Sequence, residues 1–508
     1  MKWLKTIVAQ VEELYPEGMV LVESGISPSG SYHMGYLREI LTCDAVLLEL
    51  KRRGRQARHI HFVDDQDGFR KVPANLPPEY EKYLGQPLCD MPAPDGSKQS
   101  YADYCLKPFL DSVESLGVSM GVVRSHEKYR EGYFTEAIEV VLAHFEEVKK
   151  VLEDISGRKT DEQWSPIQVN ESGYLKKRKF IGIDKDKKTI TYLDKTGQEA
   201  LVDYSAGKVK LDWRIDWPAR WWLLNVQVEP FGKDHATKGG SFETGKGLME
   251  KVFNAPPPFP IPYDFINQAG KTKKMSASKG DAIMMEDVVK VLPPEVVRYF
   301  VFRSPPTKLL FFDPENVAKL IDEFAELLAK ADKDEDDKQL IELCENGVDS
   351  VVSSVPFSHL VASYQSALRD PTKTLEIISR TEHGSATENE KDIIISELKF
   401  IDNWLDHWAP EDIKFSLDNP ANPSEFNDQE KAFLNSLAEK IESAPIDADG
   451  EWFHKTIYEF KNTTEFEPKE LFGAVYKALI GKTSGPRAGW FLSILPRDML
   501  IKRLKLNF

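Results

Sequence analysis

A single stretch, Glu23–Glu39, constrains the fold of this chain more than any other. The apolar residues 19–22 have the pattern of a buried strand, and residues 33–50 carry apolar side chains at helical spacing. The turn between them contains two glycines, a proline and a serine: Gly25, Pro28, Ser29 and Gly30. A strand, a glycine-bearing turn and a helix form an anion site in α/β folds, because free N–H groups and the positive end of the helix dipole meet there.

Two residues at the start of the expected helix fit such a site. His33 can donate a hydrogen bond to a phosphate oxygen, and Gly35 leaves room for a flat group against the backbone. An ordinary strand, turn and helix with a polar capping residue is the alternative interpretation, because short motifs also arise by chance.

Length and composition indicate a globular protein of two to four domains: 508 residues, 41% hydrophobic and 29% charged. The four cysteines form no CxxC pair, so neither a disulfide framework nor a zinc knuckle is indicated. No apolar run is long enough for a membrane span, and the first residues lack the pattern of a signal peptide. We therefore expect a cytoplasmic protein without a membrane partner.

The negative charge is concentrated in one segment. Net charge is -16, but residues 331–450 alone carry 27 acidic and 10 basic residues, a net of -17. The rest of the chain is therefore close to neutral, at about +1. The acidity is typical of solvated helix faces and does not exclude RNA binding by a basic groove elsewhere.

A second strand, expected at 58–63, runs directly into the charged segment Asp64–Lys71. Charged residues at the carboxyl end of a parallel strand lie where ligands bind in open α/β sheets. A calcium loop is not indicated, because the closing glutamate is missing. A polar loop with internal ion pairs is the alternative.

The following segments alternate in character. Residues 72–100 are rich in proline, and 101–155 are helical with a strand expected near 118–123. Short runs with strand character suggest a small β-rich insertion: 179–183, 189–193 and 199–204. A further strand is expected at 263–266 and a charged linker at 332–338, and residues 340–480 show repeated amphipathic helices.

Four of the ten tryptophans fall between residues 213 and 222, interleaved with Arg214, Asp216 and Arg220. A hydrophobic clamp is the common explanation for such a cluster, but the interleaved charges favour the wall of a cleft. After a strand expected at 226–228, the segment 229–236 is again a charged strand end. His235 within it could also be a purely structural histidine.

The loop 270–280 contains four lysines between residues 271 and 279, with serine hydroxyls and bounding glycines. Such a cationic loop can grip a polyphosphate. A solvated basic loop is the alternative.

These segments resemble the two signatures of class I aminoacyl-tRNA synthetases, a Pro-Ser/Thr-Gly turn with His-x-Gly-His and the string Lys-Met-Ser-Lys-Ser. The chain departs from them at Tyr36, where the class has His, and at Ala277, where it has the second Lys, although Lys279 follows closely. With the strings around Trp213 and His235, the chain resembles class I lysyl-tRNA synthetases over essentially its full length.

This resemblance implies an α/β fold, with a Rossmann-like doubly wound parallel sheet, a β-rich insertion and an all-α C-terminal region. Residues 1–74 and 213–284 would form the two halves of the catalytic domain. Residues 75–212 would form the insertion, helical and then β-rich. Residues 285–330 would be a helical junction, and residues 331–508 the anticodon-binding region.

The implied activity is ATP-dependent ligation of L-lysine to the 3′ end of tRNA(Lys) through a lysyl-adenylate. The implied catalytic residues are His33, Lys274 and Lys279. The implied ATP-binding residues are Pro28, Ser29, Gly30, His33, Gly35, Tyr36, Asp234, Met275, Ser276 and Ser278. The implied lysine-binding residues are Gly25, Ser27, Trp213, His235 and Tyr263. Specificity also requires a buried acceptor for the ε-ammonium group, which no motif identifies.

Mg²⁺ is expected to accompany ATP, and a monomer is favoured. No structural zinc is expected, because residues 97–104 and 169–173 lack the Cys and His ligands that many relatives carry there. Three alternatives remain open: a class I synthetase for another amino acid, with glutamate nearest; a nucleotidyltransferase that does not use tRNA; and a non-catalytic tRNA-binding paralogue, which Ala277 keeps open.

Overall fold

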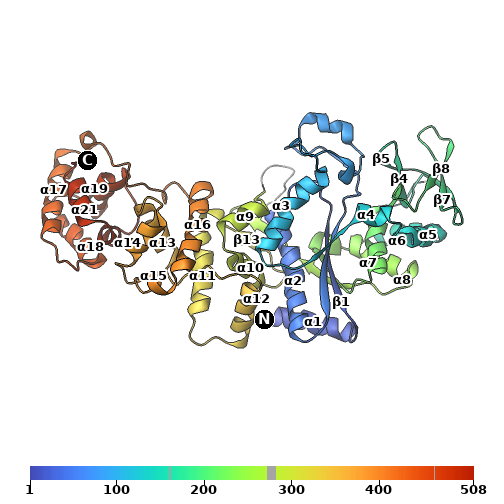
Figure 1. The fold of residues 1–508 in the computed structure, drawn as a ribbon, viewed down its shortest axis with the longest axis horizontal. Coiled ribbons are helices and arrows are strands. Elements are labelled where there is room, and N and C mark those ends of the chain that lie inside the picture. Colours follow the sequence, from blue (N-terminus) through green and yellow to red (C-terminus); the bar gives the residue numbers. More distant parts are fainter. Residues whose placement is uncertain (158, 162, 272–281, 463, 508) are drawn as a thin grey trace. The chain divides into compact units, whose positions relative to one another are not determined.

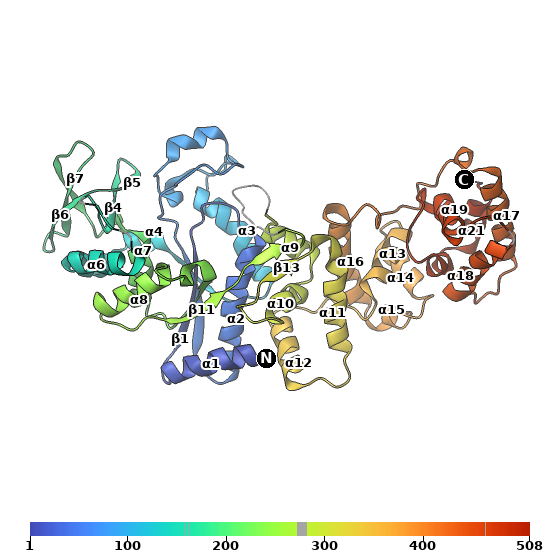
Figure 2. The same ribbon diagram turned by 180° about the vertical axis from the view of Figure 1, so that it is seen from behind.

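The computed structural model describes residues 1–508 except 158, 162, 272–281, 463 and 508. The chain forms two compact units (Figures 1 and 2). The α/β unit comprises Met1–Val289, Val297–Phe312 and Lys333–Val348. The helical unit comprises Lys290–Val296, Asp313–Asp332 and Asp349–Phe508.

A five-stranded sheet organises the α/β unit. Its strands lie in the order β11-β10-β1-β2-β3, and every neighbouring pair is parallel. The strands are β1 (Val20–Ile26), β2 (Ala57–Val63), β3 (Gly121–Arg124), β10 (Val228–Gly232) and β11 (Phe259–Tyr263). From β1 the chain first adds strands on one side and later on the other, so β1 and β10 flank the topological switch point of a doubly wound sheet. The predicted fold class is confirmed.

Helices cover both faces of this sheet. On one face, α2 (Leu37–Arg52) packs on β1, β2 and β10, and α1 (Lys2–Leu14) packs on α2. On the other face, Ile60 and Phe62 of β2 share a buried core with Ile138, Trp217 and Leu248. That core draws on α5 (Thr135–Ala143), α6 (Phe145–Ser156), α7 (Trp213–Leu224) and α8 (Ser241–Lys251). Burial on both faces also encloses polar residues of the central strands, including Glu23, His59 and Glu229.

Much of the segment between β2 and α7 lies outside the five-stranded sheet, although β3 belongs to that sheet. Its helices are α3 (Tyr101–Ser115), α4 (Ser125–Arg130), α5 and α6. Two antiparallel sheets follow, β5-β4-β9 and β6-β7-β8. Their strands are β4 (Ile167–Glu171), β5 (Tyr174–Lys177), β6 (Phe180–Asp184), β7 (Thr189–Leu193), β8 (Glu199–Asp203) and β9 (Val209–Leu211). The β-rich character expected from the sequence is therefore present.

The rest of the chain is predominantly helical, in agreement with the predicted C-terminal region. After β12 (Ile266–Gln268) come α9 (Met285–Val291), α10 (Pro294–Phe302), β13 (Leu310–Phe312), α11 (Val317–Ala329) and α12 (Glu335–Glu345). The later helices are α13 (Phe357–Ser366), α14 (Pro371–Ile378), α15 (Ala386–Asn389), α16 (Lys391–His407), α17 (Asp428–Glu442), α18 (Gly450–Glu459), α19 (Pro468–Ile480), α20 (Ala488–Ile494) and α21 (Arg497–Leu504). Helices α17–α21 enclose a common apolar core.

Four local predictions were wrong. The strand expected at 226–228 is β10, which begins at Val228, so residues 229–232 lie within the strand and not after it. The stretch expected as a linker at 332–338 begins helix α12, because Asp334 and Asp337 form a reciprocal capping box at its start. The expected strand 263–266 is two strands, since β11 ends at Tyr263 and β12 begins at Ile266. The expected helix 33–50 starts with a 3₁₀ turn at Met34–Tyr36, and α2 proper begins at Leu37. Throughout the chain as described, no helix is long and apolar enough to cross a membrane.

Candidate active site

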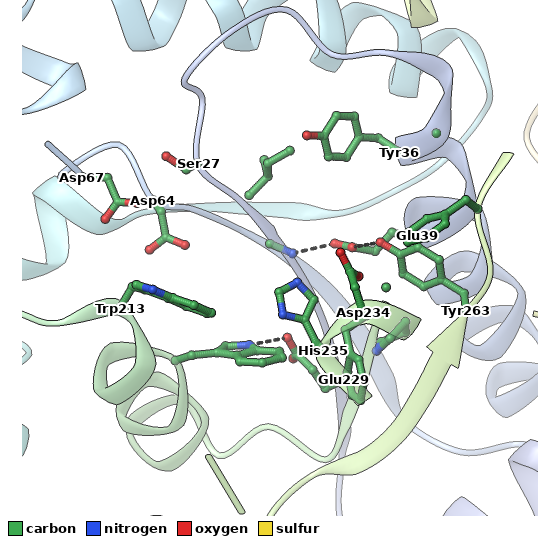
Figure 3. Close-up of a pocket in the computed structure, with 18 of the residues that line it drawn as sticks. Ser27, Tyr36, Glu39, Asp64, Asp67, Trp213, Glu229, Asp234, His235 and Tyr263 are labelled. Carbon is green, nitrogen blue, oxygen red and sulfur yellow. Dashed lines mark hydrogen bonds between the residues drawn. The ribbon is translucent and has the colours of Figure 1, made fainter. Parts of the chain in front are cut away.

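A cavity of about 390 Å³ lies where β1 and β10 separate at their carboxyl ends. Its walls come from the residues after β1, the start of α2, the residues after β2, helix α7, strand β10 with the turn that follows, and the segment from Tyr263 to Ile266. Figure 3 shows Ser27 and Tyr36 above the cavity and Trp213, His235 and Glu229 below it. Ligands of doubly wound sheets bind at this switch point, outside the strand ends.

His33 and Gly35 are fitted to each other at one edge of the cavity. His33 caps the 3₁₀ turn, and its Nδ1 accepts a hydrogen bond from the backbone N–H of Gly35 at 3.1 Å. A neutral ring with Nδ1 as acceptor carries its proton on Nε2. A Cβ atom on residue 35 would lie 2.6 Å from Cε1 of His33, so only glycine accommodates this ring position. The glycine thus allows the His33 ring to lie against the turn, a role that the sequence did not reveal.

Aromatic rings form the lower wall. His235 lies edge-on to two tryptophans, with centroid distances of 6.1 Å to Trp213 and 5.5 Å to Trp217. Trp217 also contacts Phe231 of β10 edge-on at 5.7 Å. The tryptophan cluster is therefore partly core and partly cleft wall. The position of each tryptophan on helix α7 determines whether its ring lies in the core or at the cavity, because one face of the helix packs on the sheet core and the other faces the cavity.

Carboxylates surround the opposite and deep sides. Glu39, in the first turn of α2, accepts hydrogen bonds from the Tyr263 hydroxyl at 2.6 Å and from the backbone N–H of Gly25 at 2.9 Å (Figure 3). Glu229 of β10 is 2% exposed and accepts a hydrogen bond from the Trp217 indole at 2.8 Å. Burial raises the pKa of Glu39 to about 7 and the pKa of Glu229 well above its ordinary value.

Two buried cations balance part of this negative charge. Arg220 contacts Glu23 at 2.8 Å and Asp64 at 2.9 Å, and its guanidinium lies 4.5 Å from the Phe62 ring centroid. Lys210 contacts Asp216 at 2.9 Å and Asp67 at 3.3 Å. These carboxylates raise the pKa of both cations despite burial, so both stay charged. No group of three or more His, Cys, Asp or Glu fit to hold a metal ion occurs within the described ranges.

Comparison with known proteins identifies the family. Residues 1–346 match the family model described as tRNA synthetases class I (K). The chain belongs to this family. Residues 409–507 match a second model, described as an anticodon binding domain.

Curated relatives extend this class I match over the whole chain. A protein of Methanosarcina acetivorans named lysine--tRNA ligase 1 is 38% identical over 99% of this chain and 98% of its own length. A lysine--tRNA ligase of Methanosarcina barkeri is 36% identical over 99% and 97%. A lysine--tRNA ligase of Archaeoglobus fulgidus is 36% identical over 99% of both chains.

In this class I synthetase, the residues expected from the sequence fall into three groups. The cavity brings together all five expected lysine-binding residues: Gly25, Ser27, Trp213, His235 and Tyr263. Of the expected nucleotide residues, it brings together His33, Gly35, Tyr36 and Asp234, whereas Pro28, Ser29 and Gly30 are outside its lining. Residues Lys274, Met275, Ser276, Ser278 and Lys279 lie outside the described residues.

Sequence reasoning missed the acidic residues that define the cavity of this synthetase. Glu39 ends the stretch singled out from the sequence, but no role was expected for it. Glu229 is the first residue of the charged segment 229–236, but no role was expected for it. Lys210 gave no signal at all, since its burial depends on strand β9 lying beside Asp67 and Asp216 in the folded chain.

Proposed function

We propose that this protein is an ATP-dependent lysine--tRNA ligase of class I. One observation carries the proposal: the five residues expected to bind lysine, distributed from 25 to 263, line one acidic cavity. An acidic cavity suits a substrate with two ammonium groups better than it suits glutamate. The names of the curated relatives support the same amino acid.

The proposed reaction has two steps. The carboxylate oxygen of lysine attacks the α-phosphorus of ATP, and the bond to the bridging oxygen breaks and releases pyrophosphate. The terminal ribose 2′-hydroxyl of tRNA then attacks the lysyl carbonyl, loses its proton, and displaces AMP. The protein contributes positioning and charge stabilisation rather than a nucleophile.

We assign the phosphates to His33, whose Nε2 would donate to an oxygen, and to Lys274 and Lys279 of the cationic loop. Pro28, Ser29, Gly30, Gly35, Tyr36, Asp234, Met275, Ser276 and Ser278 would complete the nucleotide site. Mg²⁺ would enter with ATP, bound mainly by phosphate oxygens and water. Lysine would lie among Gly25, Ser27, Trp213, His235 and Tyr263.

The tRNA(Lys) partner would contact the helical unit, because residues 409–507 match an anticodon binding domain. We further propose a cytoplasmic monomer with the catalytic domain in residues 1–74 and 213–284, the insertion in 75–212, a junction in 285–330 and anticodon binding in 331–508.

Aminoacylation with a panel of amino acids tests the function. The purified protein, ATP, Mg²⁺ and total tRNA are incubated with labelled lysine, glutamate or arginine, and pyrophosphate exchange is measured with and without tRNA. We expect charging with lysine alone. Charging with glutamate would replace the amino acid in the proposal. Binding of tRNA without any charging would favour the non-catalytic paralogue.

A further inference from the structure

The charged loop 64–71 forms one side of the cavity, and the proposed reaction does not use it. The loop directly follows β2, and three of its residues line the cavity: Asp64, Asp67 and Arg70. Figure 3 shows Asp64 and Asp67 on one side of the cavity and Tyr263 on the opposite side. The order of the strands explains this arrangement, because β2 and β11 lie on different sides of β1.

Hydrogen bonds fix the backbone of this loop. Asp65 is fully buried, accepts the backbone N–H of His126 at 2.9 Å and lies 2.6 Å from its ring Nδ1. Phe69 is also buried, and its N–H donates to the carbonyl of residue 86 while its carbonyl accepts the N–H of residue 85. These contacts determine the point from which the side chain of residue 70 leaves the loop.

Arg70 is the exposed arginine of the cavity. Its side chain is 66% exposed, and its contact with Asp67 is 3.6 Å long, beyond hydrogen-bonding distance. It donates no hydrogen bond to any residue that the structure describes. The other arginine of the lining, Arg220, is buried and paired with Glu23 and Asp64. Of the two, Arg70 is therefore the one whose donors are available to an anionic ligand.

An anionic ligand needs such a cation, because the lining is acidic. Six carboxylates line the cavity: Glu39, Asp64, Asp67, Asp216, Glu229 and Asp234. The proposed reaction nevertheless brings two sets of phosphates to it, those of ATP and those of the tRNA 3′ end. The cationic loop assigned to ATP follows β12, which begins shortly after Tyr263. Arg70 belongs to the opposite side of the cavity, so the anion left for it is the tRNA.

We propose that Arg70 binds the phosphodiester that precedes the terminal adenosine of the tRNA as the 3′ end enters the cavity. This inference rests on the proposed function. A guanidinium fork matches two phosphate oxygens and fixes the direction of the RNA strand as well as its position. Positive charge on this side of the cavity also reduces the repulsion between the acidic lining and the incoming strand.

The test compares a tRNA(Lys) transcript with the same transcript lacking its terminal adenosine and the phosphate before it. Equilibrium binding of both is measured for wild type, Arg70→Gln and Arg70→Lys. Arg52→Gln is the matched control, since Arg52 is 47% exposed, has a carboxylate partner in Glu49 and lies at the end of α2. Calorimetry with lysyl sulfamoyl adenosine, a stable analogue of lysyl-adenylate, measures the rest of the site without tRNA.

We expect Arg70→Gln to weaken binding of the intact tRNA about tenfold and to leave the truncated tRNA within about twofold of wild type. The salt dependence of binding should lose about one unit of slope in the plot of log K against log salt, for the intact tRNA alone. Arg70→Lys should recover part of the affinity, because lysine keeps the charge and lacks the fork.

The other ligands and the control should not respond. Binding of the adenylate analogue should stay within about twofold of wild type in both Arg70 variants, and Arg52→Gln should match wild type with every ligand. If Arg70→Gln does not give the wild-type circular dichroism spectrum, the same pair of transcripts with Arg70→Lys decides.

Three results would overturn the inference. Equal weakening of the intact and truncated tRNA would mean that Arg70 does not contact the terminal phosphodiester. Weaker binding of the adenylate analogue would assign Arg70 to the lysine or the nucleotide instead. Unchanged binding of every ligand would remove Arg70 from the site. Failure of the proposed function looks different, because wild type itself would then neither bind the analogue nor charge tRNA.

Discussion

Two regions of the α/β unit bury charged side chains. In one the positive and negative charges balance, and in the other negative charge is in excess. The first is the Arg298 cluster, in which a fully buried guanidinium donates to Asp44 at 2.8 Å, to the Leu116 carbonyl at 2.9 Å and to the Leu343 carbonyl at 2.8 Å. The cluster contains one cation and one carboxylate, so it is neutral. Each of the three guanidinium nitrogens donates a hydrogen bond.

The second region is the acidic cavity, where seven carboxylates lie in or beside the lining and the two buried cations, Arg220 and Lys210, contact four of them. Burial raises the pKa of Glu23 and of Glu39 to about 7 each, as expected for carboxyl groups that lack enough positive charge nearby. The Arg298 cluster joins segments that are distant in sequence, whereas the cavity leaves a charge deficit for something that arrives from outside. Charge balance thus separates a structural site from a binding site.

The largest expected effect comes from removing the cation of the neutral Arg298 cluster. Arg298→Met should leave Asp44 buried without its cation and two carbonyls without a donor, and should lower the free energy of unfolding by about 3–5 kcal/mol. Lysine affinity should not change, because the cavity is untouched. Urea unfolding and lysine calorimetry measure the two quantities. A stability loss below about 1 kcal/mol would contradict the role given to this cluster.

The next effect separates the acidic part of the cavity from its nucleotide edge. His33→Ala removes a donor to the phosphates but none of the carboxylates, so kcat for lysylation should fall about 100-fold. Lysine affinity should stay within about twofold. Single-turnover charging and calorimetry distinguish the two. Activity close to wild type would remove His33 from the proposed mechanism.

Removing one unbalanced charge should stabilise the protein. A carboxyl with pKa raised from 4.5 to about 7 keeps its proton in the folded state after the unfolded state has lost it. Stability from Glu39 is therefore complete below about pH 4.5 and is lost as pH rises to about 7. Glu39→Gln should raise the free energy of unfolding by about 1–3 kcal/mol at pH 8 and by almost nothing at pH 4.5. Lower stability at pH 8 would show that the carboxylate is structural.

The smallest expected effect is a pH dependence of lysine binding in wild type. Glu39 faces the Tyr263 hydroxyl and the Gly25 N–H, and it senses the charge of Arg220; Glu229 senses Glu23, Arg220 and Glu39. With a pKa of about 7, the ionised fraction of Glu39 rises about tenfold between pH 6 and pH 8, while lysine keeps its ε-ammonium proton. The Kd for lysine should fall about tenfold over this range, and the Glu39→Gln profile should be flatter.

Much of the fold could be predicted from the sequence. The strands observed at 20–26 and 57–63 were expected at 19–22 and 58–63, where short runs are followed by turn or charged residues, and the helices of the C-terminal region have clear amphipathic spacing. Helix α12 was missed because its charged first turn looks like a linker until the capping box is recognised. Helix α7 was not predicted, because tryptophans and an internal proline carry no helical pattern that stands out from a cluster of aromatic core residues.

The site was predicted only in part, for a physical reason. The expected residues were found by their place at strand ends and by resemblance of short motifs. Lys210 belongs to no such motif and lies on strand β9. Glu229 opens the charged segment 229–236, but it is a residue of β10 itself, and its side chain lines the cavity.

The sequence by itself determined what depends on neighbours along the chain: strand and helix periodicity, glycine turns, caps, and the two signature segments. Only the tertiary structure decided the balance of charge, because Glu23, Asp64 and Arg220 are far apart in sequence and meet at the end of one sheet. Electrostatic energy depends on distance and burial. The carboxylates that Arg220 and Lys210 do not contact could therefore be identified only in the folded structure.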